Sequence, residues 1–544
     1  MYTILNAIIG LGSLHVPIHL SYDPVLGGLA ALSSVWAFWY IWRFTIWPML
    51  HPNEVKELPY YVPYLGHAYS FLTNLGGLFE YGKRTFSSAQ TYLLTVAGEK
   101  MYIMSHPPNV YQVLNRLSRD EHDHDKNYHL LMRRFGISEA AITMLSQKPT
   151  VSFVQANPHL EPNPQLKTMG DMAHILIRKQ LHPGPTYDAF ESVFLDNLDK
   201  AMSFDTLSPE ALLSSQKDTK TASLVELVRW TFGRATVDAF FGPALLRVAP
   251  DFVHNYNTFD DNIWTFLYKL PTLGGHGNKS IKKLRTAVVA YLRLPEAERE
   301  GASWMVKTVI TEMKARGMGV HDIAGWLTII HWGMTSNPWR LVAWMAVHLA
   351  HNASLREAVR EELAPILATP GLTNVQLQAA VSTKAKHLAS LYNESLRFYN
   401  DPISVRELTR DVQSATGETL RKGNMIMLIH RHLLMDEQVW GADAKTFRPD
   451  RFLGEQGEAL LRNKNFTPYG GGPALCPGRF MSKSGALMFS AWLVDRFDLE
   501  IGQGKNKNGK GMPRVDLQTK NGTGVGIMGI KEGDDCVVVL SKRD

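Results

Sequence analysis

The chain has 544 residues, with 57 Lys and Arg against 51 Asp and Glu and a formal net charge of +6. Its two cysteines exclude a disulfide framework and suit a reducing compartment. No basic run or nucleic-acid motif accompanies the mildly basic balance, so we expect no nucleic-acid binding; the charge suits an acidic protein partner or an anionic membrane face.

The first predicted element is an apolar helix near the N-terminus. The first 42 residues carry one formally charged side chain, Asp23, and residues 24–42 carry none. A helix over 24–42 would span roughly 28 Å, close to the hydrocarbon core of a bilayer. Aromatic side chains lie at its end, where an interfacial belt is expected: Trp36, Trp39, Tyr40 and Trp42. Residues 1–45 are therefore predicted to be a single-pass membrane anchor, with a buried core helix as the alternative.

After the anchor, residues 46–66 are predicted to form a proline-rich hinge, and residues 67–544 a single larger domain. This domain is expected to be mainly α with a small β region. Helical periodicity extends over several of its segments, namely 223–241, 320–349, 355–366, 386–398 and 485–497. A short strand is predicted over 537–540.

One predicted helix carries an acid and a base on the same face. Glu394 and Arg397 are three residues apart, which places both on one side of the helix over 386–398. Arg451 could complete a network, because an arginine fork matches a carboxylate bidentately. We expect this triad to be structural, while a solvated ion pair is the alternative.

The segment 466–480 is the most informative stretch of the chain. Glycines 470–472 let the backbone turn tightly and approach a flat ligand closely. They deliver Cys476 before the predicted helix over 485–497, and a helix start favours a thiolate over a thiol. A thiolate so placed can bind haem iron. A buried structural cysteine at a glycine-rich turn is the alternative.

This segment resembles the cysteine-ligand loop of the haem-thiolate monooxygenases, the cytochromes P450. The Glu394–Arg397 pair is similar to the Glu-x-x-Arg motif of that family, and residues 447–452 are similar to its Pro-Glu-Arg-Phe motif. The resemblance covers about residues 50–544. Within the family, one branch is the most similar: it contains cholesterol 7α-hydroxylase, sterol 12α-hydroxylase and prostacyclin synthase. The resemblance to this branch rests on the spacing of Trp332, Asn337 and Trp344.

The resemblance implies a cytochrome P450 fold that binds haem b through the thiolate of Cys476. It implies oxidation of an apolar small molecule (a sterol, a terpenoid or another specialised metabolite) with dioxygen. Electrons would come from NADPH through the flavins of a partner haemoprotein reductase, with cytochrome b5 as a second donor. The location implied is the endoplasmic reticulum membrane, with the catalytic domain in the cytosol. Two alternatives stay open: a haem-thiolate isomerase or dehydratase that needs no reductase, and a non-enzymatic haem protein.

The oxygen-activation region departs from the family pattern. Most members have Ala-Gly-x-Asp/Glu-Thr there, and the threonine and the acid relay protons. In this chain Ser336 or Asn337 stands at the place of the threonine, Thr335 stands at that of the acid, and residues 332–340 include no carboxylate. Asn337, Ser336 and Thr335 are therefore the candidate catalytic residues. Asparagine is also found here in the branch named above.

Pro338 follows these residues and should alter the helix. It has no N–H group, and its ring would clash with the carbonyl of residue 334, so we expect the helix to open or kink. Carbonyls freed at Gly333 and Met334 could then hold water. A helix that ends or bends for packing reasons is the alternative.

A second departure concerns the haem propionates. Ala474 stands where the family usually has a basic residue, so another cation is needed, and Arg406 is the best candidate by position. His174 and Arg178 resemble the Trp-x-x-x-Arg site of the family, with a solvated helix face as the alternative. Two residues of the cysteine loop complete the candidate haem-contacting set: Tyr469 and Gly470.

Overall fold

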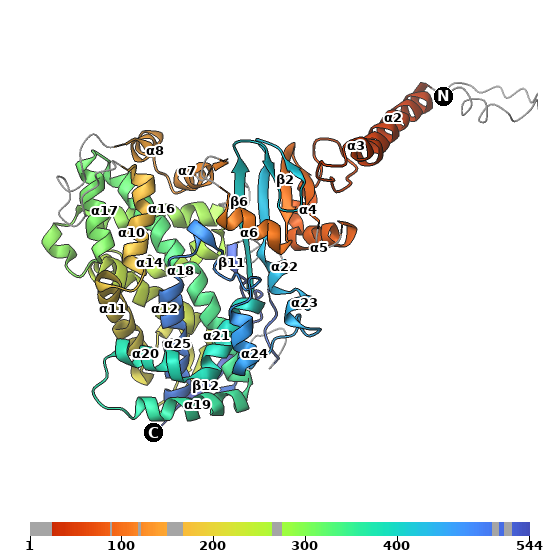
Figure 1. Cartoon of the computed structure of the whole chain (residues 1–544). Coiled ribbons are helices and arrows are strands. Elements are labelled where there is room, and N and C mark those ends of the chain that lie inside the picture. The colour runs from red at the N-terminus through yellow and green to blue at the C-terminus, as the bar shows by residue number, and fades with distance from the viewer. Residues whose placement is uncertain are drawn as a thin grey trace, which may run out of the picture.

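The computed structural model describes residues 24–86, 90–117, 121–123, 125–148, 167–263, 275–502, 511–515 and 525–543. A mostly helical body carries two larger sheets and one small one, and a single helix projects from it at the N-terminal side (Figure 1). The predicted class, mainly α with a small β region and an apolar N-terminal helix, is confirmed.

The projecting helix is α2 (Pro24–Ile41), which continues through the π-helical turn η1 (Trp42–Ile46) into α3 (Trp47–Leu50). Residues Val25–Leu50 are long and apolar enough to cross a membrane, and none of this span is buried within the protein. The prediction of an apolar helix over 24–42 is confirmed. Residues 1–23 of the predicted anchor lie outside the described residues.

The end of this helix contacts the predicted hinge. The indole of Trp36 donates to the carbonyl of Tyr61 at 2.7 Å, and the rings of Tyr40 and Tyr61 stack with centroids 6.1 Å apart. Arg43 forms an ion pair with Glu57 at 2.5 Å, and the Glu57 side chain is almost fully buried. These contacts fix the direction in which the helix leaves the body.

The sheet nearest the anchor has six strands in the order β1-β2-β9-β6-β11, with β3 paired to β6. Its β2 and β9 strands are parallel and the other neighbours are antiparallel. Its strands are β1 (Tyr92–Val96), β2 (Glu99–Met104), β3 (His122–Asp123), β6 (Asn400–Leu408), β9 (Met425–Ile429) and β11 (Val525–Ile527).

A second, four-stranded antiparallel sheet has the order β10-β12-β5-β4. It includes the predicted strand over 537–540, which is longer than expected. Its members are β4 (Leu212–Ser215), β5 (Thr219–Ser223), β10 (Phe497–Ile501) and β12 (Val537–Lys542). A two-stranded sheet pairs β7 (Val412–Gln413) with β8 (Thr419–Leu420).

Helices make up most of the body. Those before residue 262 are α4 (Ala68–Thr73), α5 (Leu75–Phe86), α6 (Pro107–Asn115), α7 (Asp125–Arg134), α8 (Glu139–Ser146), α10 (Met169–Leu181), α11 (Pro185–Ala201), α12 (Leu224–Phe241), α13 (Ala244–Val248) and α14 (Phe252–Asp261), with the 3-10 turns η2 (Phe204–Thr206) and η3 (Pro209–Ala211). Those after it are α16 (Gly275–Arg293), η4 (Glu296–Arg299), α17 (Trp304–Ala315), α18 (Val320–His351), α19 (Ala353–Leu367), α20 (Asn374–Lys384), α21 (Lys386–Phe398), α22 (His430–Leu434), α23 (Glu437–Trp440), α24 (Gly454–Leu461), η5 (Gly472–Ala474) and α25 (Arg479–Arg496).

The long helix α18 is the centre of the core and packs against α12, α16, α21 and α25 (Figure 1). Most of its residues are buried, as expected for a helix that is packed on nearly every side. It runs as one α-helix through Pro338, so the proline does not end it. Burial against four neighbouring helices stabilises a helix more than its own propensity does, which explains how α18 tolerates the missing N–H group.

The helix after the cysteine also differs from the prediction. It begins at Arg479 rather than at residue 485, and its first turn follows Pro477 and Gly478 directly. Its first two turns are mostly buried but contain small and polar residues such as Ser482, Ser484 and Gly485, so apolar periodicity did not indicate them.

Candidate functional site

The cysteine loop is shaped by glycines that no other residue could replace without strain. Gly470 and Gly472 have φ of 75° and 60°, in the left-handed region that favours glycine. A Cβ atom on Gly472 would lie 1.8 Å from the carbonyl oxygen of Leu114, at the end of α6. The loop is therefore pressed against α6 at this point, and the turn η5 then brings the chain to Cys476 and α25.

Cys476 is a free, half-buried cysteine at this position. Burial raises the pKa of its thiol; the backbone N–H groups of Gly478 and Arg479 and the charge of Arg479 oppose this rise. The predicted thiolate-favouring groups are present, but in the protein alone burial outweighs them. A metal ion changes that balance, since a coordinating thiol loses its proton. The other cysteine, Cys536, is buried directly before strand β12 of the four-stranded sheet, and burial raises its pKa to about 12.

A hydroxyl network lies next to the cysteine. The N–H of Cys476 donates to the carbonyl of Tyr469 at 3.1 Å. The Tyr469 hydroxyl contacts that of Tyr392, on α21, and lies 3.5 Å from the hydroxyl of Ser482, on α25. Tyr392 was missed altogether, because nothing local to residue 392 indicates that α21 packs behind the loop.

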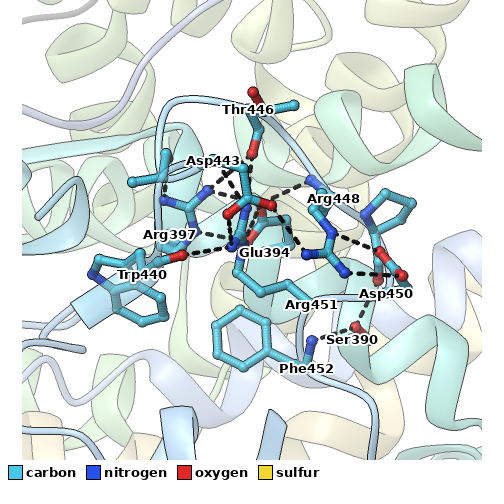
Figure 2. Close-up of polar contacts among 12 residues, drawn as sticks. Ser390, Glu394, Arg397, Trp440, Asp443, Thr446, Arg448, Asp450, Arg451 and Phe452 are labelled. Atoms are coloured by element: carbon cyan, nitrogen blue, oxygen red, sulfur yellow. Dashed lines mark hydrogen bonds and ion pairs between the residues drawn. The ribbon is translucent and has the colours of Figure 1, made fainter. Parts of the chain in front are cut away.

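The predicted structural triad is assembled in the core of the body. The buried carboxylate of Glu394 accepts from Arg397 at 2.7 and 2.8 Å, and from Arg451 at 3.2 Å. Figure 2 shows the two guanidinium groups around this carboxylate. Arg451 also donates to Asp443 at 3.0 Å, and Arg451 and Arg448 lower the pKa of that carboxyl to about 2.

The triad ties the loop before the cysteine to α21. The N–H of Arg448 donates to Glu394 at 2.9 Å, and the N–H of Phe452 donates to the Ser390 hydroxyl at 3.1 Å (Figure 2). Charged groups at this depth need full pairing, and here the paired groups also accept or donate to backbone atoms. The network therefore holds residues 448–452 against the helix that carries Glu394.

Gly333 and Asn337 are less buried than most of the residues around them on α18. Gly333 is exposed, with no atom within 4 Å of the position of a Cβ, and Asn337 is one turn further and half-buried. The Asn337 carbonyl oxygen accepts from the N–H of Ile527 at 2.8 Å, so β11 holds its side chain. Nearby, the indole of Trp344 donates to the carbonyl of Met528 at 2.8 Å. Two of the three residues that set the branch resemblance thus bind the same strand end.

The other two candidate catalytic residues precede Asn337 directly but lie on other faces of the helix. Ser336 is buried and donates to Asp260, on α14, at 2.7 Å. Thr335 is buried with its hydroxyl close to the phenol of Tyr256. Their assignment to catalysis stays a prediction, and of the three only Asn337 is not fully buried. Asp260 had no local sequence signal, because α14 is far from α18 along the chain.

The candidate propionate partners lie at different places around the loop. Arg406, on β6, is half-buried; burial lowers its pKa, and no carboxylate pairs with it among the described residues. Arg178, on α10, donates to the carbonyl of Pro473 in the cysteine loop at 2.8 Å. His174 is exposed on the same helix, one turn earlier. These contacts put α10 beside the loop and leave the propionate assignments as predictions.

The residues present fit a thiolate-bound haem. The half-buried sulfur of Cys476 receives backbone N–H groups, glycines keep the loop free of side chains, and open space lies beside Gly333. The half-buried cation of Arg406 lacks a carboxylate partner among the described residues and suits an anionic propionate. Cys476 would be the metal ligand, and Tyr469, Gly470 and Arg406 would contact the rest of the group.

Comparisons with known proteins agree with this site. A family model described as Cytochrome P450 matches residues 312–522. Cytokinin hydroxylase from Arabidopsis thaliana is 28% identical over 188 residues, which make up 35% of this chain and 34% of that protein. The chain thus spans about a third of that relative. Cytochrome P450 monooxygenase poxD from Penicillium oxalicum is 22% identical over 488 residues, 88% of this chain and 93% of that one.

A solved structure extends the likeness to the fold. Retinoic acid bound cyanobacterial CYP120A1 superposes with a TM-score of 0.62 at 15% identity, over 89% of this chain and 98% of that chain. The family match includes α18, the Glu394 network and Cys476, and the alignment with poxD covers 88% of the chain. These comparisons support a cytochrome P450: the family model covers the part of the chain that carries Cys476, and the fold is that of a solved cytochrome P450 structure.

Proposed function

We propose that the protein inserts one atom of dioxygen into an apolar small molecule, with electrons supplied by an NADPH-dependent flavoprotein reductase. The observation that carries this proposal is the half-buried sulfur of Cys476 in its glycine-rich loop, together with open space beside Gly333 on α18. Bound at Cys476, haem would supply the iron that activates dioxygen, and the thiolate would donate electron density to it.

The residues of the chain would hold the haem, orient the reacting groups and keep water away from them. Cys476 provides the ligand, and Arg406 neutralises a propionate that would otherwise lie in a poorly hydrated site. The amide of Asn337 is anchored at its oxygen by Ile527, so it orients a water or a substrate oxygen without acting as an acid. Thr335 and Ser336 are buried behind Asn337 and would act only indirectly, by fixing the position of the helix.

The substrate class we propose is apolar and membrane-partitioned, such as a sterol, a terpenoid or a similar specialised metabolite. Support comes from the exposed apolar helix α2, which would keep the enzyme at a bilayer where such molecules concentrate. We propose the endoplasmic reticulum as that membrane, with residues 67–544 as a cytosolic catalytic domain.

A groove next to the cysteine loop suits the electron donor. Its volume is about 890 Å³, and its walls include Arg116, Lys464 and the loop glycines Gly470 and Gly471. Both cations lie near the ring of Tyr111, at 5.6 and 5.3 Å from its centroid. A basic, partly aromatic groove beside the thiolate fits the acidic surface of a reductase, or of cytochrome b5 as a second donor.

The test is metabolite mass profiling of the native host with and without this gene. Loss of a product one oxygen atom heavier than the compound that accumulates would support monooxygenation and identify the substrate. A lost product of equal mass, or lighter by one water, would contradict it.

A reductase-independent isomerase or dehydratase is the second candidate. It is favoured by one observation, the absence of any carboxylate from residues 332–340, where the family usually has its proton-relay acid. Turnover of the isolated enzyme without NADPH would establish it.

A further inference from the structure

The carboxylate of Asp260, on α14, is fully buried and receives four donors from α18. Its Oδ1 accepts from Trp332 Nε1 at 3.3 Å and from Ser336 Oγ at 2.7 Å. Its Oδ2 accepts from Trp339 Nε1 at 3.0 Å and forms an ion pair with Arg340 at 2.9 Å. One side chain from a neighbouring helix thus binds four side chains within nine residues of α18.

The spacing of these donors defines one face of the helix. Residues 332, 336, 339 and 340 recur at helical intervals and all turn toward α14. Gly333 and Asn337 belong to the adjacent face, which looks onto open space and β11. Because the two faces are one residue apart, fixing the first fixes the rotation at which the second meets the site.

This stretch of α18 needs such support. Pro338 lacks an N–H group, so the carbonyl of Met334 loses its usual helical donor. Within the same turn, Arg340 Nη1 donates to the carbonyl of Ser336 at 2.8 Å and to its hydroxyl at 2.7 Å. The guanidinium of Arg340 therefore braces the helix around the proline, and Asp260 supplies its buried counter-charge.

We propose that Asp260 is a positioning residue for the oxygen-activating segment of α18. From α14 it supplies a carboxylate that residues 332–340 lack, and it sets the direction of Asn337 through Ser336 and Arg340. Both of its oxygens are occupied by donors, so it holds the segment rather than delivering a proton. This proposal rests on the proposed function and deepens it.

The test uses the full-length, haem-loaded enzyme with its reductase and compares Asp260→Asn and Ser336→Ala with the natural sequence. The control is Asp251→Asn, an exposed carboxylate at the start of the same helix whose side chain caps nothing. The readouts are the thiolate-type carbon monoxide difference band, the NADPH consumed per product, and kcat separately from KM.

We expect both variants to keep the thiolate band while the product formed per NADPH falls, by about tenfold to a hundredfold for Asp260→Asn and less for Ser336→Ala. The loss should be in kcat, with NADPH diverted to peroxide, and Asp251→Asn should match the natural enzyme. The double change Asp260→Asn with Arg340→Gln, which removes both charges and keeps amide partners, should recover part of the coupling.

Asp260→Asn leaves the charge of Arg340 buried and could fail to fold; Ser336→Ala, which leaves the ion pair intact, then decides. Unchanged coupling in a folded Ser336→Ala or Asp260→Asn would overturn the proposal. Failure of the proposed function looks different, because the natural enzyme itself would then form no NADPH-dependent oxygenated product.

Discussion

His331 is a buried imidazole without a hydrogen-bond partner among the described residues. It lies one turn before Thr335 on α18, with its ring centroid 5.1 Å from that of Tyr256 and 5.4 Å from that of Phe252. Burial lowers its pKa to about 3, so the folded protein holds it neutral. A neutral polar ring in an aromatic cage costs stability, because both nitrogens lose their water.

We predict that His331→Phe stabilises the protein by about 1–3 kcal/mol. The gain should depend on pH. Between about 3 and an unfolded pKa of about 6.5, the unfolded histidine binds a proton that the folded one does not, so stability falls as the pH drops through this range. The variant loses this contribution, and its advantage in thermal midpoint should be larger at pH 5 than at pH 7.5.

The matched control is His321→Asn, at an exposed position in the first turn of the same helix. It should leave the thermal midpoint and its pH dependence unchanged. A His331→Phe protein that is less stable than the natural one at both pH values would show that the imidazole has a partner we have not identified.

Glu394 presents the opposite case, a buried charge with full pairing. Glu394→Gln removes the negative charge that the buried guanidinium groups of Arg397 and Arg451 share, and we predict a loss of about 3–5 kcal/mol in the free energy of unfolding. Denaturant titration followed by haem absorbance measures it. Glu361→Gln, on the exposed side of α19, should cost nothing measurable. Equal stability of the two variants would remove the structural role we assign to the network.

The elements around the site differ in how far the sequence predicts them. The cysteine loop and the Glu394 motif are local patterns, in which a few residues at fixed spacing carry the geometry. The predicted helices over 320–349 and 386–398 are similarly close to α18 and α21, because long apolar periodicity determines them.

What the sequence could not predict depends on contacts between distant segments. Asp260 and Ser336 are 76 residues apart and meet only when α14 crosses α18. Asn337 binds Ile527, 190 residues later. The pKa of the Cys476 thiol depends on two opposing effects. The sequence indicated the helix-start groups that lower this pKa, but not the burial that raises it by more.

The contact between the cysteine loop and α6 can be tested through its glycine. Gly472→Ala places a Cβ 1.8 Å from the Leu114 carbonyl in addition to straining a φ of 60°. We predict loss of haem binding, measured as the haem-to-protein absorbance ratio. Gly371→Ala is the matched control: its φ of 77° is equally strained, but its Cβ meets nothing within 4 Å. It should cost roughly 1 kcal/mol and keep the haem. Full haem content in Gly472→Ala would refute the contact.

At the scale of the whole molecule, we propose that the apolar helix α2 and the basic groove decide how the enzyme meets its redox partner. The Arg43–Glu57 ion pair attaches the end of the N-terminal helical segment to the body. The groove with Arg116 and Lys464 lies at the cysteine loop. The reductase proposed above would therefore bind at this groove, on a surface that α2 does not cover.

We predict that the double change Arg116→Glu with Lys464→Glu weakens reductase coupling. The KM for reductase should rise and its dependence on ionic strength should flatten or reverse, because like charges now face each other. The carbon monoxide difference band should stay intact. Lys384→Glu, an exposed lysine on α20 that is not part of the groove, serves as the control. Unaltered reductase kinetics in the double variant would place the donor site elsewhere.

The central claim is that Cys476 is the thiolate ligand of a haem. The measurement that tests it most directly is the reduced carbon monoxide difference spectrum of the purified full-length protein and of its Cys476→His variant. We predict the red-shifted band of a thiolate-ligated haem in the natural protein, and its replacement by a histidine-type band, or loss of haem, in the variant. A natural protein without the thiolate band, or a variant that keeps it, would contradict the account.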